Sequence, residues 1–210
     1  MKIYSHSDIL GLEKYFRRNL INTVSGFKSA HLIGTRSNEG VNNLAVFNSV
    51  IHIGATPPYV GFILRPTTVE RQTYNYIKST GLYTLNAITA SIHAQAHQTS
   101  AKYTADISEF EACELEAAFL ENFPIPFVAT SPIKMAMSYV EEYPIKANGT
   151  ILIIGKIEKL ILSEGIVEAT GHIDFEKLNI VSINGLDTYF STQKLGRYAF
   201  ARPNQPTRRL

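Results

Sequence analysis

Residues 65–81 combine side chains that are suited to binding an anion. Arg65 ends the apolar segment YVGFILR, which is predicted to form a strand buried on both faces. Thr67 and Glu70 match a capping box and predict a helix over residues 67–80, ended by Gly81. A helix N-terminus presents unpaired N–H groups and partial positive charge, which together favour a phosphate group.

The side chains around this helix start add positive charge and hydroxyl groups. They belong to Arg65, Thr68, Arg71 and Thr73, and they can donate charge-assisted hydrogen bonds to a phosphate. Capping boxes are common, however, so two interpretations stay open at this point. Either the segment binds a phosphate, or Thr67 only caps a helix and both arginines are solvated.

Other patterns that could carry chemistry are weak or absent. The chain contains neither G-x-G-x-x-G nor G-x-S-x-G, and its Gly149 and Gly155-Lys156 have the wrong spacing for a P-loop. His93 and His97 stand four residues apart without a third ligand, so two polar residues on a helix face are expected there and no metal site. The single cysteine, Cys113, is expected to be a small buried hydrophobe.

The elements that must position these residues are mostly strands. An amphipathic helix is predicted over residues 7–24 with Ser7 as N-cap, and another over residues 91–102. Strands are predicted by alternation and β-branched residues, and Lys146 to Gly149 is typical of a hairpin turn. The predicted strands span residues 30–35, 41–53, 59–65, 82–86, 134–143, 150–162 and 166–173. Without regular strand–helix alternation, the sequence indicates an α+β fold, mainly β, built on an antiparallel barrel.

Length and composition limit the classes of protein to which the chain can belong. The chain has 210 residues, 20 basic and 18 acidic, for a net charge of +2, which indicates neither a nucleic-acid nor a membrane partner. A single globular domain is expected over residues 1–200, followed by a basic, proline-containing and solvated tail over 201–210. One cysteine and no signal-peptide pattern lead us to expect a cytoplasmic protein.

Two segments resemble the flavin reductase-like family of FMN-binding split barrels. The first, NNLAVFNSVIHIGATPP, spans residues 42–58, and the second, RPTTVERQTYNYIKSTGLYTLN, spans residues 65–86. The family has an Asn-Leu-Ala-x-Phe-x-Ser stretch, a Pro-Pro pair, a buried strand and a Thr-x-x-Asn-Ile helix that ends at Thr-Gly. The likeness continues through Ser131-Pro132 and residues 154–157, and it covers most of residues 20–165.

The resemblance implies a six-stranded antiparallel split β-barrel with Greek-key topology and flanking helices, assembled as a homodimer with FMN near the interface. It implies that seven consecutive residues border the flavin: Asn43, Leu44, Ala45, Val46, Phe47, Asn48 and Ser49. For Leu44, Val46 and Phe47 the alternative is core packing. The phosphate candidates are Ser49, Arg65, Thr68, Arg71 and Thr73.

The resemblance also implies an NAD(P)H-dependent flavin reductase, with a monooxygenase that receives reduced flavin as a partner. In such an enzyme the nicotinamide passes hydride to flavin N5, and the protein mainly binds and orients, so no catalytic side chain is expected. Many relatives carry a histidine where this chain has Asn148-Gly149-Thr150. Two alternatives therefore stay open: an FMN-binding electron-transfer or storage protein without its own nicotinamide site, and a split barrel without flavin.

Overall fold

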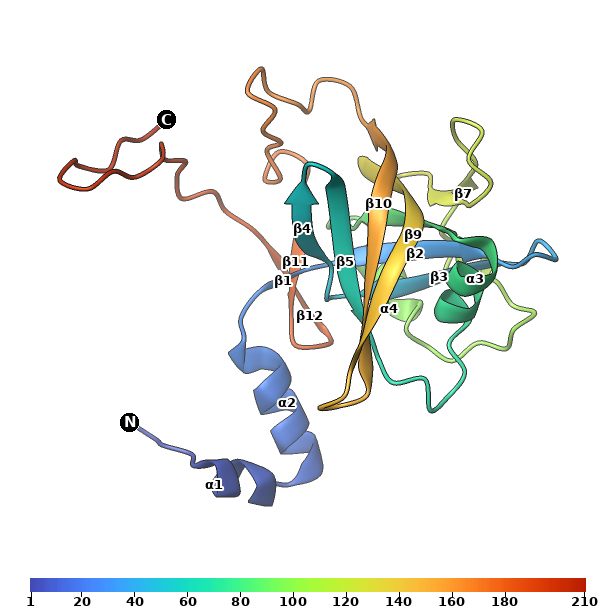
Figure 1. Cartoon of the computed structure of the whole chain (residues 1–210), viewed down its shortest axis with the longest axis horizontal. Helices are drawn as coiled ribbons and strands as arrows, with labels where there is room; N and C mark the ends of the chain where they lie inside the picture. The colour runs from blue at the N-terminus through green and yellow to red at the C-terminus, as the bar shows by residue number, and fades with distance from the viewer.

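A seven-stranded antiparallel sheet forms the body of the protein. The computed structural model describes all residues from 1 to 210 (Figure 1). The strands lie in the order β3-β2-β6-β9-β10-β5-β4. Their bounds are β2 His31–Arg36, β3 Asn42–Phe47, β4 Ile51–Ala55, β5 Pro58–Leu64, β6 Leu82–Ala87, β9 Ile133–Ile145 and β10 Thr150–Leu162. The expected mainly β, antiparallel fold is confirmed, but the count of six strands is wrong.

Two smaller sheets contain the remaining strands. β1 (Lys28–Ser29), β11 (Val181–Asn184) and β12 (Thr188–Ser191) form a three-stranded sheet in the order β1-β11-β12. β7 (Ala117–Ala118) pairs with β8 (Phe127–Val128). β11 and β12 were not predicted from the sequence, and the predicted strand over 166–173 is reduced to a single bridge between Val167 and Ile173.

β9 and β10 form a long hairpin within the seven-stranded sheet. Its turn lies at residues 146–149, where Gly149 has the positive φ of 72° that the turn requires. One core cluster packs beneath it, including Ile33, Phe62, Tyr83 and Ile153, all fully buried. A second cluster joins the body to the three-stranded sheet and contains Cys113, which is buried as predicted.

The predicted strand over 41–53 is wrong in its extent, because the chain turns between β3 and β4. The Asn48 amide donates to the Gly185 carbonyl at 2.8 Å. The Ser49 hydroxyl donates to the Ile63 carbonyl at 3.0 Å and accepts from the Ile63 N–H at 3.2 Å. These side chains bond to backbone groups of distant segments, so the ladder of β3 stops and β4 starts anew beside β5.

The helices differ from prediction mainly at their starts. The helix predicted over 7–24 is two helices, α1 (His6–Gly11) capped by Ser5 and α2 (Lys14–Val24) capped by Glu13. The helix predicted over 91–102 is shorter, α4 (His93–Gln98), and α5 (Glu109–Ala112) follows after a loop. None of these helices is long and apolar enough to cross a membrane.

The helix after β5 begins four residues later than the capping box predicts, since its N-cap position is Arg71 and not Thr67. α3 spans Gln72–Thr80, its N-cap position is Arg71, and no side chain caps it. The Glu70 carboxylate accepts weakly from the Asn75 amide at 3.5 Å instead of reaching back to Thr67. The capping box at Thr67 is therefore wrong, whereas Gly81 ends the helix in the left-handed conformation as predicted, with φ 72°.

Candidate functional site

A cavity of about 730 Å³ opens between β3, the start of α3, the loop after α4 and the β11–β12 connection. Its volume lies in the range of small-molecule and cofactor sites. Twenty-five residues line it, and they come from segments far apart in the sequence. Three cationic side chains, Arg65, Arg71 and Lys102, share this lining with Glu70 and Glu109.

On the β3 side, buried hydrogen bonds hold the polar lining in place. Asn43 is 3 % exposed, and its amide donates to the hydroxyl oxygens of Thr35 at 2.9 Å and Thr73 at 3.1 Å. The Thr73 hydroxyl accepts this bond, so its own proton stays available to a ligand. Asn43 therefore positions a donor at the start of α3.

The hydroxyl proton of Ser49 is less available to a ligand than that of Thr73. Both line the cavity, but the Ser49 hydroxyl already donates to the Ile63 carbonyl. A hydroxyl has one proton to donate. Ser49 can donate to a phosphate only by releasing that carbonyl.

At the start of α3, Arg71 presents an unpaired donor. Its Nε atom is buried and has no hydrogen-bond partner, although Arg71 lines the cavity. An unsatisfied buried donor carries a desolvation penalty of about 1–3 kcal/mol, and more for a charged group. An anion in the cavity would relieve that penalty, and the uncapped helix start beside it has free N–H groups as well.

The opposite wall comes from the loop after α4, residues 99–105. Lys102 adds a third cation, while Thr99, Ser100 and Thr104 add hydroxyl groups. Glu109, the first residue of α5, faces the same cavity and is 5 % exposed. Its Oε2 accepts from the Leu44 N–H at 2.9 Å, and burial raises the pKa of the carboxyl group.

Nine of the eleven residues predicted to contact a flavin line this cavity: Asn43, Ala45, Val46, Phe47, Asn48, Ser49, Arg65, Arg71 and Thr73. Leu44 does not, because it is fully buried in the core, the alternative left open for it. Thr68 does not line it either. It was placed in the first turn of a helix that starts only at Gln72.

Sequence reasoning missed the wall formed by residues 99–105 and by Glu109. The run Thr99-Ser100-Ala101-Lys102 joins hydroxyls to a lysine after a helix, and that composition was the available signal for an anion site. No local pattern marks Glu109, Ile183 or Leu186, which reach the cavity through tertiary packing. The predicted histidine pair lies elsewhere: His93 and His97 each pack against Tyr189 with ring centroids 5.8 Å apart.

A cavity of this size beside an uncapped helix start, in a mainly β fold, is typical of proteins that bind a small anionic molecule. The model of the flavin reductase like domain matches residues 26–176. The chain therefore belongs to the flavin reductase-like family, as its sequence motifs indicate.

Solved structures agree with this assignment. A split-barrel protein of Shewanella frigidimarina NCIMB 400, assigned as a flavin reductase, is 43 % identical with a TM-score of 0.93 over 96 % of this chain and 100 % of its own. Nitrilotriacetate monooxygenase component B from Bacillus cereus is 19 % identical with a TM-score of 0.82, over 94 % and 98 % of the two chains. The 2-nitrobenzoate 2-nitroreductase NbaA of Pseudomonas fluorescens is 16 % identical with a TM-score of 0.81, over 98 % of both. No curated protein sequence matches the chain.

Proposed function

We propose that the 730 Å³ cavity binds FMN and that the protein is an NAD(P)H-dependent flavin reductase. The observation that carries the proposal is the buried, unpartnered Nε of Arg71 in a cavity that also holds Arg65 and Lys102. A phosphate monoester bears a charge of about −1.5 to −2 at pH 7 and pairs well with guanidinium groups. The apolar side chains Val46, Phe47 and Leu186 in the same lining suit a flat aromatic ring.

The residues of the chain bind and orient in this proposal. Arg65, Arg71, Lys102 and the Thr73 hydroxyl hold the phosphate, and Asn43 keeps Thr73 in place. Bound FMN supplies the hydride chemistry itself, so the site needs no acid–base pair. β3 and the β11–β12 connection line the cavity and would contact the ring of a bound flavin.

The nicotinamide site is the weakest part of the resemblance. The β9–β10 turn carries Asn148-Gly149-Thr150 in place of the family histidine. The turn lies beside the phosphate end of the cavity, because a Cβ at Gly149 would be 3.7 Å from Pro66, the neighbour of Arg65. The side chain of Asn148 is already hydrogen-bonded within the turn. Its Oδ1 accepts from the Thr150 N–H at 3.1 Å and from the Thr150 hydroxyl at 2.7 Å. This favours, as a second candidate, an FMN-binding electron-transfer or storage protein that a partner reductase reduces.

The test begins with the absorption spectrum of the purified protein and an FMN titration. Anaerobic mixing of the FMN-loaded protein with NADH and, separately, NADPH then follows the oxidised flavin band, a signal of the cofactor itself. Bleaching with either donor supports the reductase. Persistent oxidised flavin with both donors, but bleaching with a partner reductase, favours the electron-transfer protein. Absence of FMN binding rejects both.

We further propose a homodimer, a cytoplasmic location and delivery of reduced flavin to a monooxygenase. The resemblance supports the homodimer and the monooxygenase. The name of the Bacillus cereus neighbour, a monooxygenase component, is consistent with such a partnership. A monooxygenase assay that depends on added protein and NAD(P)H would test the delivery.

A further inference from the structure

The helix α3 has Arg71 and Thr73 at its start, but little within the helix itself fixes its direction. It has nine residues, and no side chain caps its start. Isolated helices shorter than about 12 residues are marginal in water, so tertiary contacts must hold them. Thr73 and Ile77 are the only buried residues of α3. A helix with so small a buried face needs a further attachment to keep one direction.

Four polar side chains attach α3 to β9, and we call them the α3–β9 cluster: Tyr74, Lys78, Tyr139 and Glu142. Tyr74 and Lys78 stand four residues apart and share one face of the helix. The Tyr74 hydroxyl donates to Glu142 Oε1 at 3.0 Å, and Lys78 Nζ lies 3.4 Å from Glu142 Oε2. Lys78 also donates to the Tyr139 hydroxyl at 2.9 Å and lies 4.3 Å from the centroid of that ring.

A β-bulge in β9 brings Tyr139 and Glu142 to the same face of the sheet. In a regular strand, residues three apart point to opposite faces. In β9, Val140 is an extra residue between the pairs that the strand forms with Ile154 and Gly155 of β10. Both side chains therefore reach α3. Bulges that redirect a side chain are frequent next to active sites, and this bulge is the backbone feature that makes the cluster possible.

Glu142 is the centre of the α3–β9 cluster. Its Oε2 is buried without a hydrogen-bond partner, and the charge of Lys78 offsets it. Burial and the contact with Glu142 raise the pKa of Tyr74, which keeps the proton that it donates. The side chains of Lys78 and Glu142 are 39 % and 21 % exposed, so their ion pair adds little to global stability. Loss of these contacts should change the direction of α3 more than the folding of the chain.

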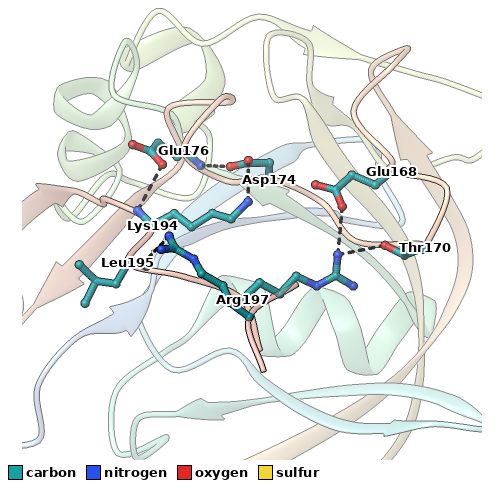
Figure 2. Close-up of polar contacts among 8 residues, drawn as sticks. Glu168, Thr170, Asp174, Glu176, Lys194, Leu195 and Arg197 are labelled. Atoms are coloured by element: carbon teal, nitrogen blue, oxygen red, sulfur yellow. Dashed lines mark hydrogen bonds and ion pairs between the residues drawn. The ribbon is translucent and has the colours of Figure 1, made fainter. Parts of the chain in front are cut away.

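No other ion pair of the chain reaches α3. Lys194 pairs with Asp174 at 3.2 Å and Arg197 with Glu168 at 3.0 Å, and both pairs hold the C-terminal segment against the loop after β10 (Figure 2). The remaining pair lies within β10. The α3–β9 cluster is thus the one charged attachment of the helix beside the cavity.

We propose that the α3–β9 cluster positions the start of α3 and thereby holds Arg71 and Thr73 against the phosphate of FMN. None of its four side chains lines the cavity, so they act through the helix. Tyr74 follows Thr73 directly in the chain, and a shift at Tyr74 is passed on to the Thr73 hydroxyl and to the buried Nε of Arg71. This positioning role rests on the proposed FMN binding.

Riboflavin, which is FMN without its phosphate, separates the contribution of the phosphate from that of the ring. Fluorescence titrations with both flavins give the ratio of the riboflavin Kd to the FMN Kd for the parent, Tyr74→Phe and Glu142→Gln. The ratio should fall about three- to ten-fold in each variant, the scale of one lost hydrogen bond, while the riboflavin affinity stays near that of the parent. Partial unfolding would weaken both flavins equally and leave the ratio unchanged.

Glu158→Gln is the matched control. Glu158 accepts from the Ser138 hydroxyl at 2.6 Å and pairs with Lys156 at 3.0 Å, so it has the same kinds of partners as Glu142 but no contact with α3. Each Glu→Gln variant also removes a negative charge, which by itself would favour a phosphate. The ratio should therefore not fall in Glu158→Gln. An equal fall in this control, or the parental ratio in either cluster variant, overturns the proposal.

Amide hydrogen exchange in the flavin-free protein tests the attachment of α3 without FMN. The amides of residues 72–80 should exchange faster in Glu142→Gln than in the parent, whereas Glu158→Gln should exchange like the parent. Equal exchange in Glu142→Gln and the parent overturns the attachment. A parent that binds neither flavin rejects the proposed function and the role at the phosphate, and the exchange data still decide whether the cluster fixes α3.

Discussion

At the scale of the residue, Arg71 is the side chain whose surroundings most require a ligand. Its buried Nε lacks a partner, whereas Arg65, on the same cavity, is exposed. We therefore expect Arg71→Ala to weaken FMN binding by about 2–3 kcal/mol, the scale of a buried charge-assisted contact, and Arg65→Ala to weaken it by less. Fluorescence titration measures both. Equal affinity in Arg71→Ala and the parent would remove Arg71 from the site.

Glu109 brings negative charge into the same cavity. Burial raises the pKa of its carboxyl group, so the group stays protonated to a higher pH than an exposed glutamate. An ionised Glu109 would repel a bound phosphate, so FMN affinity should decrease as the pH rises through this raised pKa. Glu109→Gln keeps an acceptor for the Leu44 N–H and should remove that part of the pH dependence. Parallel FMN titrations of parent and variant between pH 4.5 and 8 measure the difference, because the phosphate of FMN titrates identically in both.

His31, at the start of β2, makes stability depend on pH. Its Nδ1 is buried without a partner, and burial lowers the pKa of the ring to about 4. The unfolded chain binds the proton near pH 6.5 while the folded chain stays neutral. The free energy of unfolding should therefore fall as the pH is lowered from about 6.5 toward 4, by up to about 3 kcal/mol. Urea denaturation at several pH values measures the fall, and His31→Gln should flatten it. If the free energy of unfolding falls equally with pH in the parent and in His31→Gln, His31 does not have this role.

At the scale of the element, the side chain of Tyr83 on β6 lies against Gly155 of β10, where no further side chain fits. A Cβ at Gly155 would collide with the Tyr83 hydroxyl and lie 2.8 Å from Tyr83 Cζ and 3.0 Å from the Ser138 carbonyl oxygen. The register of β9 and β10 shifts at this glycine. Gly155 therefore lets the long hairpin bend over the buried tyrosine.

A double-mutant cycle tests this contact between Gly155 and Tyr83. Gly155→Ala should lower the free energy of unfolding by about 1–3 kcal/mol through overpacking. Tyr83→Phe should be neutral or stabilising, because the buried Tyr83 hydroxyl has no hydrogen-bond partner. In the Tyr83→Phe background, Gly155→Ala should be less damaging, since the nearest colliding atom is gone. Strictly additive effects in chemical denaturation would show that the contact is not the cause.

At the scale of the whole molecule, the proposed homodimer makes thermal stability depend on protein concentration. If two copies pair only when folded, the Tm should rise with protein concentration by mass action. Differential scanning fluorimetry over a hundred-fold range of protein concentration measures the rise. A Tm that is independent of concentration would argue against the pair.

The sequence by itself determined the family, the antiparallel β class and much of one wall of the cavity. The Asn-Leu-Ala-x-Phe-x-Ser stretch and the helix segment from Thr73 to Gly81 are each contiguous, so they can be recognised from the sequence alone. Nine of the eleven named residues therefore reach the cavity. Gly81 and Gly149 were also predictable, because a turn that needs positive φ selects glycine locally.

Only the tertiary structure decided where α3 begins and which residues form the second wall of the cavity. Thr67 and Glu70 have the local signature of a cap, but the chain turns at Thr67 and Thr68, and α3 starts only at Gln72. Lys102 and Glu109 lie more than 50 residues from Asn43 in sequence and meet it across the cavity through packing. Local sequence propensity indicates which secondary structure a segment favours. Long-range contacts depend instead on how whole helices and strands bury their apolar faces.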